Sequence, residues 1–193
     1  MFAFSNLIEF AHDLRKEDIT IYKKLNKHFP YATVCIWNTS IFNHFMTHQL
    51  FRYYTLVEVE KVAMVSVFHF LTEFKSGVLI DPSAEILERY SGQENNNIIV
   101  IPLVSQAPLL KQDNIMTPSL EKILVDVFCN PVIFASEQGS EMLLIFSKAF
   151  SQFRINIHRM LRYAKRRGKH EDLLTWLRSN TEFSHLWVNI DKI

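Results

Sequence analysis

The chain is poor in glycine, proline and cysteine. Its 193 residues contain 4 glycines, 6 prolines and 2 cysteines. An all-β sandwich needs many tight turns that use glycine and proline, so this composition favours a helix-rich architecture. Cys35 and Cys129 both lie in apolar runs. This placement indicates buried free thiols rather than a disulfide, and it favours a reducing cytoplasm.

Long apolar runs and an export signal are also missing. No apolar run reaches the roughly 18 residues that a membrane span needs. The first residues, MFAFSNLIEFAHDLRKED, show neither a basic start nor a small-residue cleavage site. We therefore expect a cytoplasmic protein without membrane contact. The 48% of hydrophobic residues and 16 phenylalanines indicate one domain over 1–193, with an α/β core over 1–150 and C-terminal helices over 151–193.

Apolar periodicity predicts alternating helices and strands, followed by helices alone. Strands are expected at 33–37, 53–60, 78–80 and 98–101, and helices at 7–14, 19–29, 41–46, 61–74, 84–90, 119–129, 141–150, 153–167 and 171–179. Thr117 and Pro118 are interpreted as the cap and first residue of the helix at 119–129. The segment 102–116 is expected to be a long loop. This order predicts an α/β fold, in which helices flank an open mixed or parallel sheet of four or five strands.

The clearest electrostatic feature is a basic segment between residues 152 and 170. It carries seven cations and no acid, so the rest of the chain has a net charge of −6. On a helix these cations form a stripe opposite the apolar side, which can bind nucleic-acid phosphates or an acidic partner. Tyr163 and Arg162 could add stacking with single-stranded RNA. The alternative is a solvated face. The predicted binding residues are Arg159, Arg162, Lys165, Arg166, Arg167 and Lys169.

Two carboxylates in the second strand form a further candidate site. Glu58 and Glu60 are two residues apart, so both side chains project from one face of the strand. Such a pair can hold Mg²⁺ for phosphoryl chemistry. The alternative is that this face is solvated while Leu56, Val57 and Val59 point inward.

A polar turn between strand and helix is the third candidate. Asn38, Thr39 and Ser40 precede a helix, and free backbone donors at a helix start can bind phosphate. Phosphate-binding turns usually contain glycine, which this turn lacks, so ordinary capping is the alternative. His44 and His48 have metal-compatible spacing, but Phe45 stands where a zinc protease motif needs glutamate. No metal site and no catalytic triad are expected.

Four stretches together resemble a known family. They are FPYATVCIWNTSIFNHFMTHQ, TLVEVEKVAMVSVFHFL, TPSLEKILVDVF and INIHRMLRYAKRRGKHEDLLTWL. In order and spacing they resemble the C-terminal domain of AbiEi-type proteins, the antitoxin and regulator half of type IV toxin–antitoxin (abortive infection) systems, and in particular an uncharacterised bacterial branch of that group. The resemblance covers roughly residues 19–179. Members carry an N-terminal winged helix that binds operator DNA, for which fewer than thirty residues before Phe29 are too few.

The strand–turn–helix–strand order is also similar to the nucleotidyltransferase fold. That family needs Gly-Ser in the turn and three acids, whereas here Asn38–Thr39–Ser40 fill the turn, Glu58 and Glu60 stand for two acids, and 98–104 supplies no third. The resemblances imply a non-catalytic AbiEi-like antitoxin or regulatory module without cofactor, acting through contact with a cognate toxin protein or a nucleic acid. The alternative is a Mg²⁺-dependent nucleotidyltransferase-like enzyme that uses Glu58 and Glu60.

Overall fold

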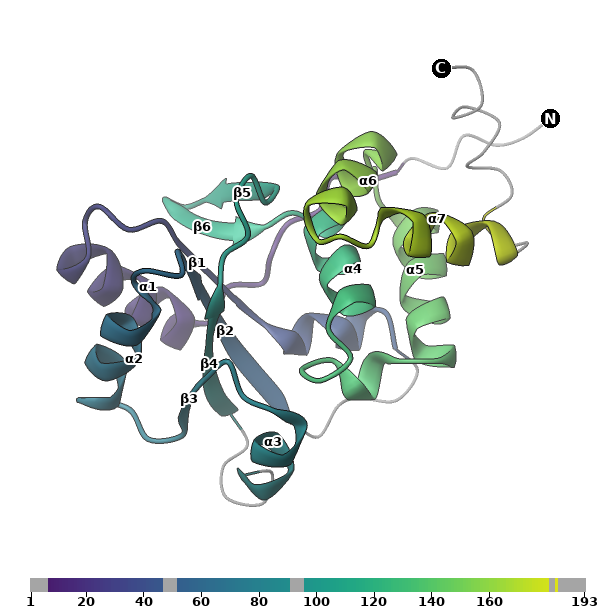
Figure 1. The fold of residues 1–193 in the computed structure, drawn as a ribbon. Coiled ribbons are helices and arrows are strands. Elements are labelled where there is room, and N and C mark those ends of the chain that lie inside the picture. Colours follow the sequence, from purple (N-terminus) through teal and green to yellow (C-terminus); the bar gives the residue numbers. More distant parts are fainter. Residues whose placement is uncertain (1–6, 47–51, 91–95, 181–182, 184–193) are drawn as a thin grey trace.

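A mixed sheet covered by helices organises the chain. The computed structural model describes residues 7–46, 52–90, 96–180 and 183 (Figure 1). In chain order the elements are α1 (Lys16–His28), β1 (Val34–Asn38), the 3₁₀ helix η1 (Thr39–His44), β2 (Tyr53–Val59), α2 (Met64–Thr72), β3 (Val78–Ile80), α3 (Ala84–Tyr90), β4 (Asn96–Pro102), β5 (Leu109–Gln112), β6 (Ile115–Pro118), α4 (Leu120–Cys129), the 3₁₀ helix η2 (Ala135–Glu137), α5 (Ser140–Gln152), α6 (Ile157–Arg166) and α7 (His170–Ser179).

The main sheet has the strand order β1-β2-β4-β3. β1 runs antiparallel to β2, whereas β2, β4 and β3 are parallel. β4 therefore lies between two parallel neighbours, as its continuous apolar run at 98–101 predicts. β5 and β6 form a separate two-stranded sheet. The predicted α/β class, with a mixed sheet flanked by helices and a helical C-terminal part, is confirmed.

Helices cover both faces of the main sheet, because successive strand residues point to opposite sides. On one face, Val57 and Val59 of β2 pack with buried residues of α1 and α2. On the other face, Trp37 and Leu56 pack with residues of α4, α5, α6 and α7. Figure 1 shows these two helical layers to either side of the strands. β2 is thus buried on both faces, and no residue of its second half is solvated.

Two of the predicted elements are wrong. Residues 7–14 are not helical; Ile8 instead forms a backbone bridge with Phe153, and the Ile8 N–H donates to the Gln152 carbonyl at 3.1 Å. Phe10 packs edge-on against Phe153 and is partly buried, whereas Leu7 and Ile8 stay exposed. The segment 102–116 is not a loop throughout, since it contains β5 and the start of β6.

A tight turn explains the hairpin of β5 and β6. Asp113 and Asn114 join the strands, and both have a positive φ, of 50° and 63°. Two residues with positive φ form the turn that suits a two-residue hairpin, and Asp and Asn tolerate this backbone conformation. Thr117 and Pro118 lie in β6 and pair with β5, so they are not the cap and first residue of the helix as predicted. The cap of α4 is Ser119, whose Oγ accepts the Lys122 N–H at 3.4 Å.

Two further expectations concern cysteines and membranes. Cys35 is buried and Cys129 is half-buried, and both are free thiols as predicted. Burial raises the pKa of Cys129 to about 11, so this thiol stays protonated at neutral pH.

In the part of the chain that the structure describes, none of the helices has the length and apolarity to cross a membrane.

Candidate functional site

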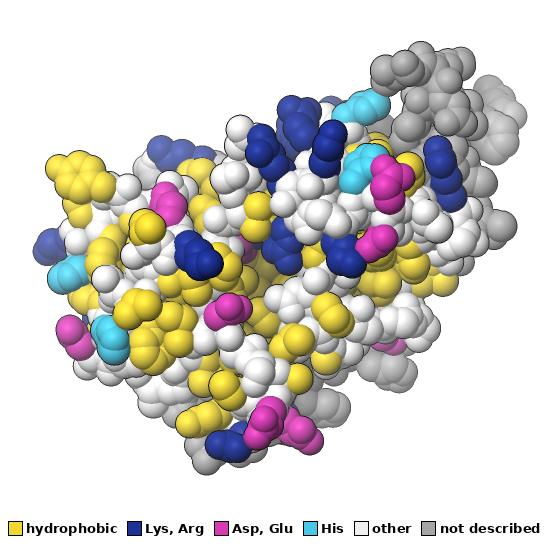
Figure 2. All heavy atoms as spheres, viewed as in Figure 1, with side chains coloured by type: hydrophobic (Ala, Val, Ile, Leu, Met, Phe, Trp, Pro, Cys, Tyr) yellow, Lys and Arg dark blue, Asp and Glu magenta, His cyan; other side chains and the backbone are white. Residues whose placement is uncertain are grey.

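The basic helix α6 is fixed at both ends and along one side. Asn156 caps its start, with Oδ1 accepting the Arg159 N–H at 2.9 Å, and Gly168 follows its end with a φ of 67°. Four residues of the helix are buried in the core: Met160, Leu161, Tyr163 and Ala164. This burial sets the rotation of the helix, so that most of its cations point away from the sheet. Figure 2 shows Lys and Arg side chains gathered over α6.

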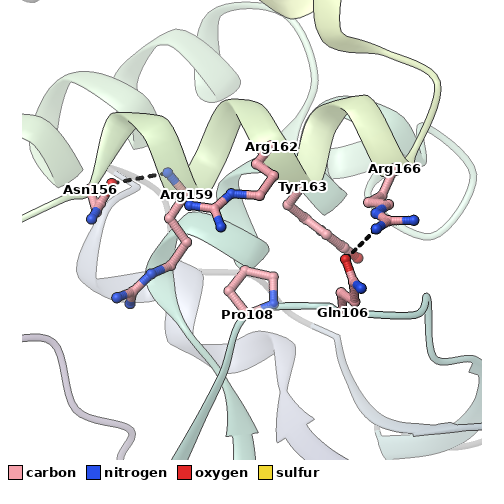
Figure 3. A pocket seen from close by; sticks show the side chains of 7 residues that line it. All are labelled: Gln106, Pro108, Asn156, Arg159, Arg162, Tyr163 and Arg166. Atoms are coloured by element: carbon pink, nitrogen blue, oxygen red, sulfur yellow. Dashed lines mark hydrogen bonds between the residues drawn. The ribbon is translucent and has the colours of Figure 1, made fainter.

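Three arginines of α6 line a groove of about 560 Å³. They project from the helix toward the segment between β4 and β5, which contributes uncharged residues to the opposite wall (Figure 3). This segment follows the carboxyl end of β4, where parallel sheets commonly place ligands. We call this feature the basic groove, and its lining consists of Gln106, Pro108, Asn156, Arg159, Arg162, Tyr163 and Arg166.

The positive charge in the basic groove is only partly compensated. Arg166 donates a hydrogen bond to Gln106 Oε1, which carries no charge. Arg159 Nη1 lies 3.9 Å from Glu121 Oε1, at the limit of an ion pair. Arg162 has no ion-pair or hydrogen-bond partner among the described residues. Three guanidinium groups around one hollow, with one distant carboxylate, create a site that attracts anions.

The residues of the predicted basic stripe take four different placements. Arg159, Arg162 and Arg166 lie together in the basic groove, while Lys165 is exposed outside its lining. Lys169 pairs with Asp172 at 2.7 Å, at the start of α7. Arg167 turns inward and pairs with Asp126 at 3.1 Å. The structure therefore brings together half of the predicted binding residues and gives Arg167 a structural role.

Arg167 belongs to a buried cluster of charges beneath the basic groove. Lys122 Nζ lies 2.6 Å from each Glu58 oxygen and 2.5 Å from Asp126 Oδ2. Tyr163 donates its hydroxyl hydrogen bond to Asp126 Oδ1 at 2.9 Å. Trp37 Nε1 donates to Glu58 Oε1 at 2.8 Å. We call this set the buried ion network, and its members are Trp37, Glu58, Lys122, Asp126, Tyr163 and Arg167.

The charges of the buried ion network balance, because two carboxylates face two cations. Burial alone would lower the pKa of Lys122, but the charges of Asp126 and Glu58 raise it well above the ordinary value. Lys122 therefore stays protonated. Since the network joins β1, β2, α4 and α6, it holds the basic helix against the sheet. Tyr163 belongs to both features, as it lines the groove and binds Asp126.

The two carboxylates that the alternative interpretation assigns to a shared Mg²⁺ ion have separate partners. Glu58 is only 2% exposed and binds Lys122, so the solvated-face alternative is wrong for it. Glu60 lies beyond the end of β2 and accepts the Thr33 N–H at 2.9 Å. Within the described ranges no three His, Cys, Asp or Glu side chains are grouped as metal ligands would be. His48 lies outside the described residues.

The polar turn uses its hydrogen-bonding groups internally. Asn38 Oδ1 accepts the Ser40 N–H at 2.9 Å, which is the capping arrangement. Thr39 Oγ1 accepts the Tyr54 N–H at 2.9 Å, and Asn38 Nδ2 donates to the Tyr54 carbonyl at 3.0 Å. The turn thus attaches η1 to the start of β2. This geometry favours the capping interpretation over the phosphate-binding one.

Sequence interpretation missed Lys122, Asp126 and the facing wall of the groove. Lys122 and Asp126 are not among the candidate residues that the sequence indicates, yet they are charged residues that are 0% and 4% exposed. One available signal was Glu58, a charged residue inside an otherwise apolar strand, which needs a buried cation. Gln106 and Pro108 carried no signal, because their position opposite α6 depends on the course of the chain after β4.

The model of a family of unknown function, DUF6577, matches residues 1–182. No curated protein and no solved structure matches the chain.

Proposed function

Because the chain belongs to the DUF6577 family, whose function is unknown, we propose a function from the geometry of the site. The chain is a non-catalytic regulatory module that binds the phosphate backbone of a nucleic acid in the basic groove. The observation that carries this proposal is the set of three arginines around one groove, of which Arg162 has no partner among the described residues.

The chemistry of these arginines suits phosphates. A guanidinium group offers a planar fork of donors that matches a phosphate oxygen pair, and it keeps its charge at any physiological pH. Arg159 and Arg166 are seven residues apart, which corresponds to about 10 Å along a helix. The three groups can therefore contact more than one phosphate of a chain. A single small anion would leave at least one of them unused.

The groove is poor in features that anchor a protein partner. The centres of protein interfaces are enriched in exposed aromatic side chains, which fill pockets on the partner. Here Pro108 is the main apolar contribution, since Tyr163 is only 2% exposed. For the same reason Tyr163 cannot present its ring to a base, so the predicted stacking is not part of the proposal. Contacts to phosphates position a nucleic acid without reading its sequence.

Nucleotidyl transfer is left out of the proposal. That alternative needs the carboxylates of Glu58 and Glu60 to hold Mg²⁺ together. Glu58 is instead held by Lys122 in the buried ion network, and Glu60 accepts a backbone N–H. No observation favours the transferase over the binding module.

The family resemblance supplies the biological context of the proposal. The four stretches that resemble AbiEi-type proteins suggest an antitoxin or regulator that acts in the cytoplasm of a bacterium. In that context a cognate toxin protein is a further partner. The phosphate-binding groove would then serve the regulatory side of such a system.

A pair of matched triple variants tests the proposal. Arg159→Gln, Arg162→Gln and Arg166→Gln together remove the charge of the groove. The control replaces Lys23, Lys27 and Lys61 by Gln, which are exposed and lie on or beside the helices of the opposite face. Both variants lose three positive charges. Binding is measured by fluorescence anisotropy with labelled duplex DNA, single-stranded DNA and single-stranded RNA.

The proposal predicts that the groove variant weakens binding to at least one of these nucleic acids by about tenfold or more. The expectation rests on the loss of three charge-assisted hydrogen bonds. The control is expected to change binding by less than about threefold, as general charge loss acts only at long range. Equal affinities of the two variants, or no binding by the unaltered protein, would overturn the proposal.

A further inference from the structure

A second pocket lies at the start of β2, away from the basic groove. It has a volume of about 260 Å³ and shares no lining residue with the groove. Its walls come from the turn after β1, the start of β2, α3 and the segment that ends in η2. The lining consists of Thr39, Arg52, Tyr54, Ala84, Leu87, Glu88, Val132, Ile133, Ala135, Ser136 and Glu137. We call it the Glu137 pocket.

Glu137 differs from every other buried carboxylate that the structure describes. Asp18 pairs with Arg15 at 2.7 Å, and Glu58 and Asp126 pair with Lys122. Glu121 has Arg159 at 3.9 Å and accepts the Asn156 N–H at 3.0 Å. Glu137 is only 3% exposed, but among the described residues it accepts a hydrogen bond only from its own backbone N–H. Within the described residues it has no Lys, Arg or His partner.

A buried carboxylate without a cation is unfavourable, because burial removes its hydration. This cost raises the pKa of Glu137 to about 7. The other titratable groups on the lining are Arg52, Tyr54 and Glu88. Arg52 and Glu88 are exposed, while Tyr54 is half-buried. A bound cation would supply the charge that the fold leaves out, and would keep Glu137 ionised at neutral pH.

The remaining walls restrict what that cation is. Leu87 and Ile133 are buried, and Val132, Ala84 and Ala135 add further apolar surface. A pocket of this size with a single buried carboxylate suits a compact molecule with one charged end. A bare divalent ion would need several oxygen ligands, and the lining offers one buried carboxylate.

We propose that the Glu137 pocket binds a small organic cation, in which a protonated primary amine donates to the Glu137 carboxylate and a short carbon chain lies against Leu87 and Ile133. This site is independent of the proposed function, since it shares no residue with the basic groove. A failure of either proposal leaves the other intact.

Three probes of one size test the charge requirement on the full chain. Pentylamine is protonated at neutral pH, 1-pentanol has a similar shape without charge, and pentanoate has the opposite charge. Binding is measured by saturation-transfer NMR titration. The proposal predicts that pentylamine binds at least about tenfold more tightly than 1-pentanol, and that pentanoate does not bind. Equal binding of the amine and the alcohol, or no binding of the amine, would overturn it.

Two glutamate variants assign the site. Glu137→Gln keeps the shape of the side chain and removes the charge, so pentylamine binding is expected to fall at least about tenfold while 1-pentanol binding is unchanged. The matched control is Glu85→Gln, an exposed carboxylate on α3 outside the lining, which is expected to leave binding unaltered. Equal affinity of the Glu137→Gln variant and the unaltered protein for pentylamine would show that the amine binds elsewhere.

The pH dependence gives an independent check on the Glu137 carboxylate. The amine stays protonated well above neutral pH, whereas Glu137 gains a proton below its pKa of about 7. The affinity for pentylamine is therefore expected to fall about tenfold for each pH unit below that value. An affinity for pentylamine that stays constant from about pH 5 to about pH 8 would exclude Glu137 as the partner.

Discussion

Removing the central cation of the buried ion network is the sharpest test of how the basic helix is held. Lys122→Met replaces a buried ammonium group by an apolar side chain of similar length. Lys122 is 0% exposed and has carboxylate oxygens at 2.5 and 2.6 Å, so solvent cannot take its place. Asp126 keeps Arg167 and Tyr163, but Glu58 keeps only the Trp37 N–H as a side-chain partner within the described part of the chain.

The expected loss is about 3–5 kcal/mol of unfolding free energy, which is typical when one partner of a buried ion pair is removed. Total stabilities are on the order of 5–15 kcal/mol, so this loss is a large share. Urea denaturation followed by circular dichroism measures it. The control Lys23→Met, at an exposed position of α1, is expected to change stability by less than about 0.5 kcal/mol.

The sign of the pH dependence follows from Glu58. Burial raises its pKa, and in the variant the opposing charge of Lys122 is gone. A carboxyl with a raised folded-state pKa favours the folded state at low pH, and this stability is lost as pH rises through that pKa. The Lys122→Met variant is therefore expected to be least destabilised at acidic pH. A loss below about 1 kcal/mol at pH 7, or a loss that grows toward acidic pH, would refute the reasoning.

Two other predictions concern the Glu137 pocket and the hairpin. Since burial raises the pKa of Glu137 from 4.5 to about 7, the protein is expected to lose up to roughly 3 kcal/mol as pH rises through this range. Glu137→Gln should flatten that part of the urea-denaturation profile, and an unchanged slope would contradict it. Asn114→Gly is expected to raise Tm, and Asn114→Val to lower both Tm and the free energy of unfolding, the latter by at least about 1 kcal/mol, because φ is 63° at this position. A thermal melt that ranks Val above Gly would contradict this.

The elements of the main sheet could be predicted because their signals are local. The apolar run at 98–101 and the alternation around Val57 and Val59 depend only on neighbouring residues. The hairpin was missed because its strands are short, and its turn signal, Asp113–Asn114, lies within a segment that also holds prolines. The apolar pattern at 7–14 was misleading, because Leu7 and Ile8 stay exposed and Phe10 packs against Phe153, a partner that is distant in sequence.

The candidate site could be predicted in part. The positive charge around α6 could be predicted, since seven cations lie within the one segment from residue 152 to residue 170. The different placements of these cations could not be predicted, because the inward orientation of Arg167 depends on Asp126, which is 41 residues away. Glu58 and Lys122 are 64 residues apart, so neither residue signals the other locally. Glu137 looked like an ordinary polar residue, and its burial arises only from the packing of η2 against other elements.

A salt titration of nucleic-acid binding tests the central claim most directly. Each neutralised phosphate of a single strand contributes about 0.7 to the slope of log affinity against log salt concentration. If Arg159, Arg162 and Arg166 each contact a phosphate, the triple glutamine variant should have a slope about 2 units shallower than the unaltered protein. The Lys23, Lys27 and Lys61 control should keep the original slope. Equal slopes for the groove variant and the unaltered protein would contradict the claim that the basic groove binds the phosphate backbone.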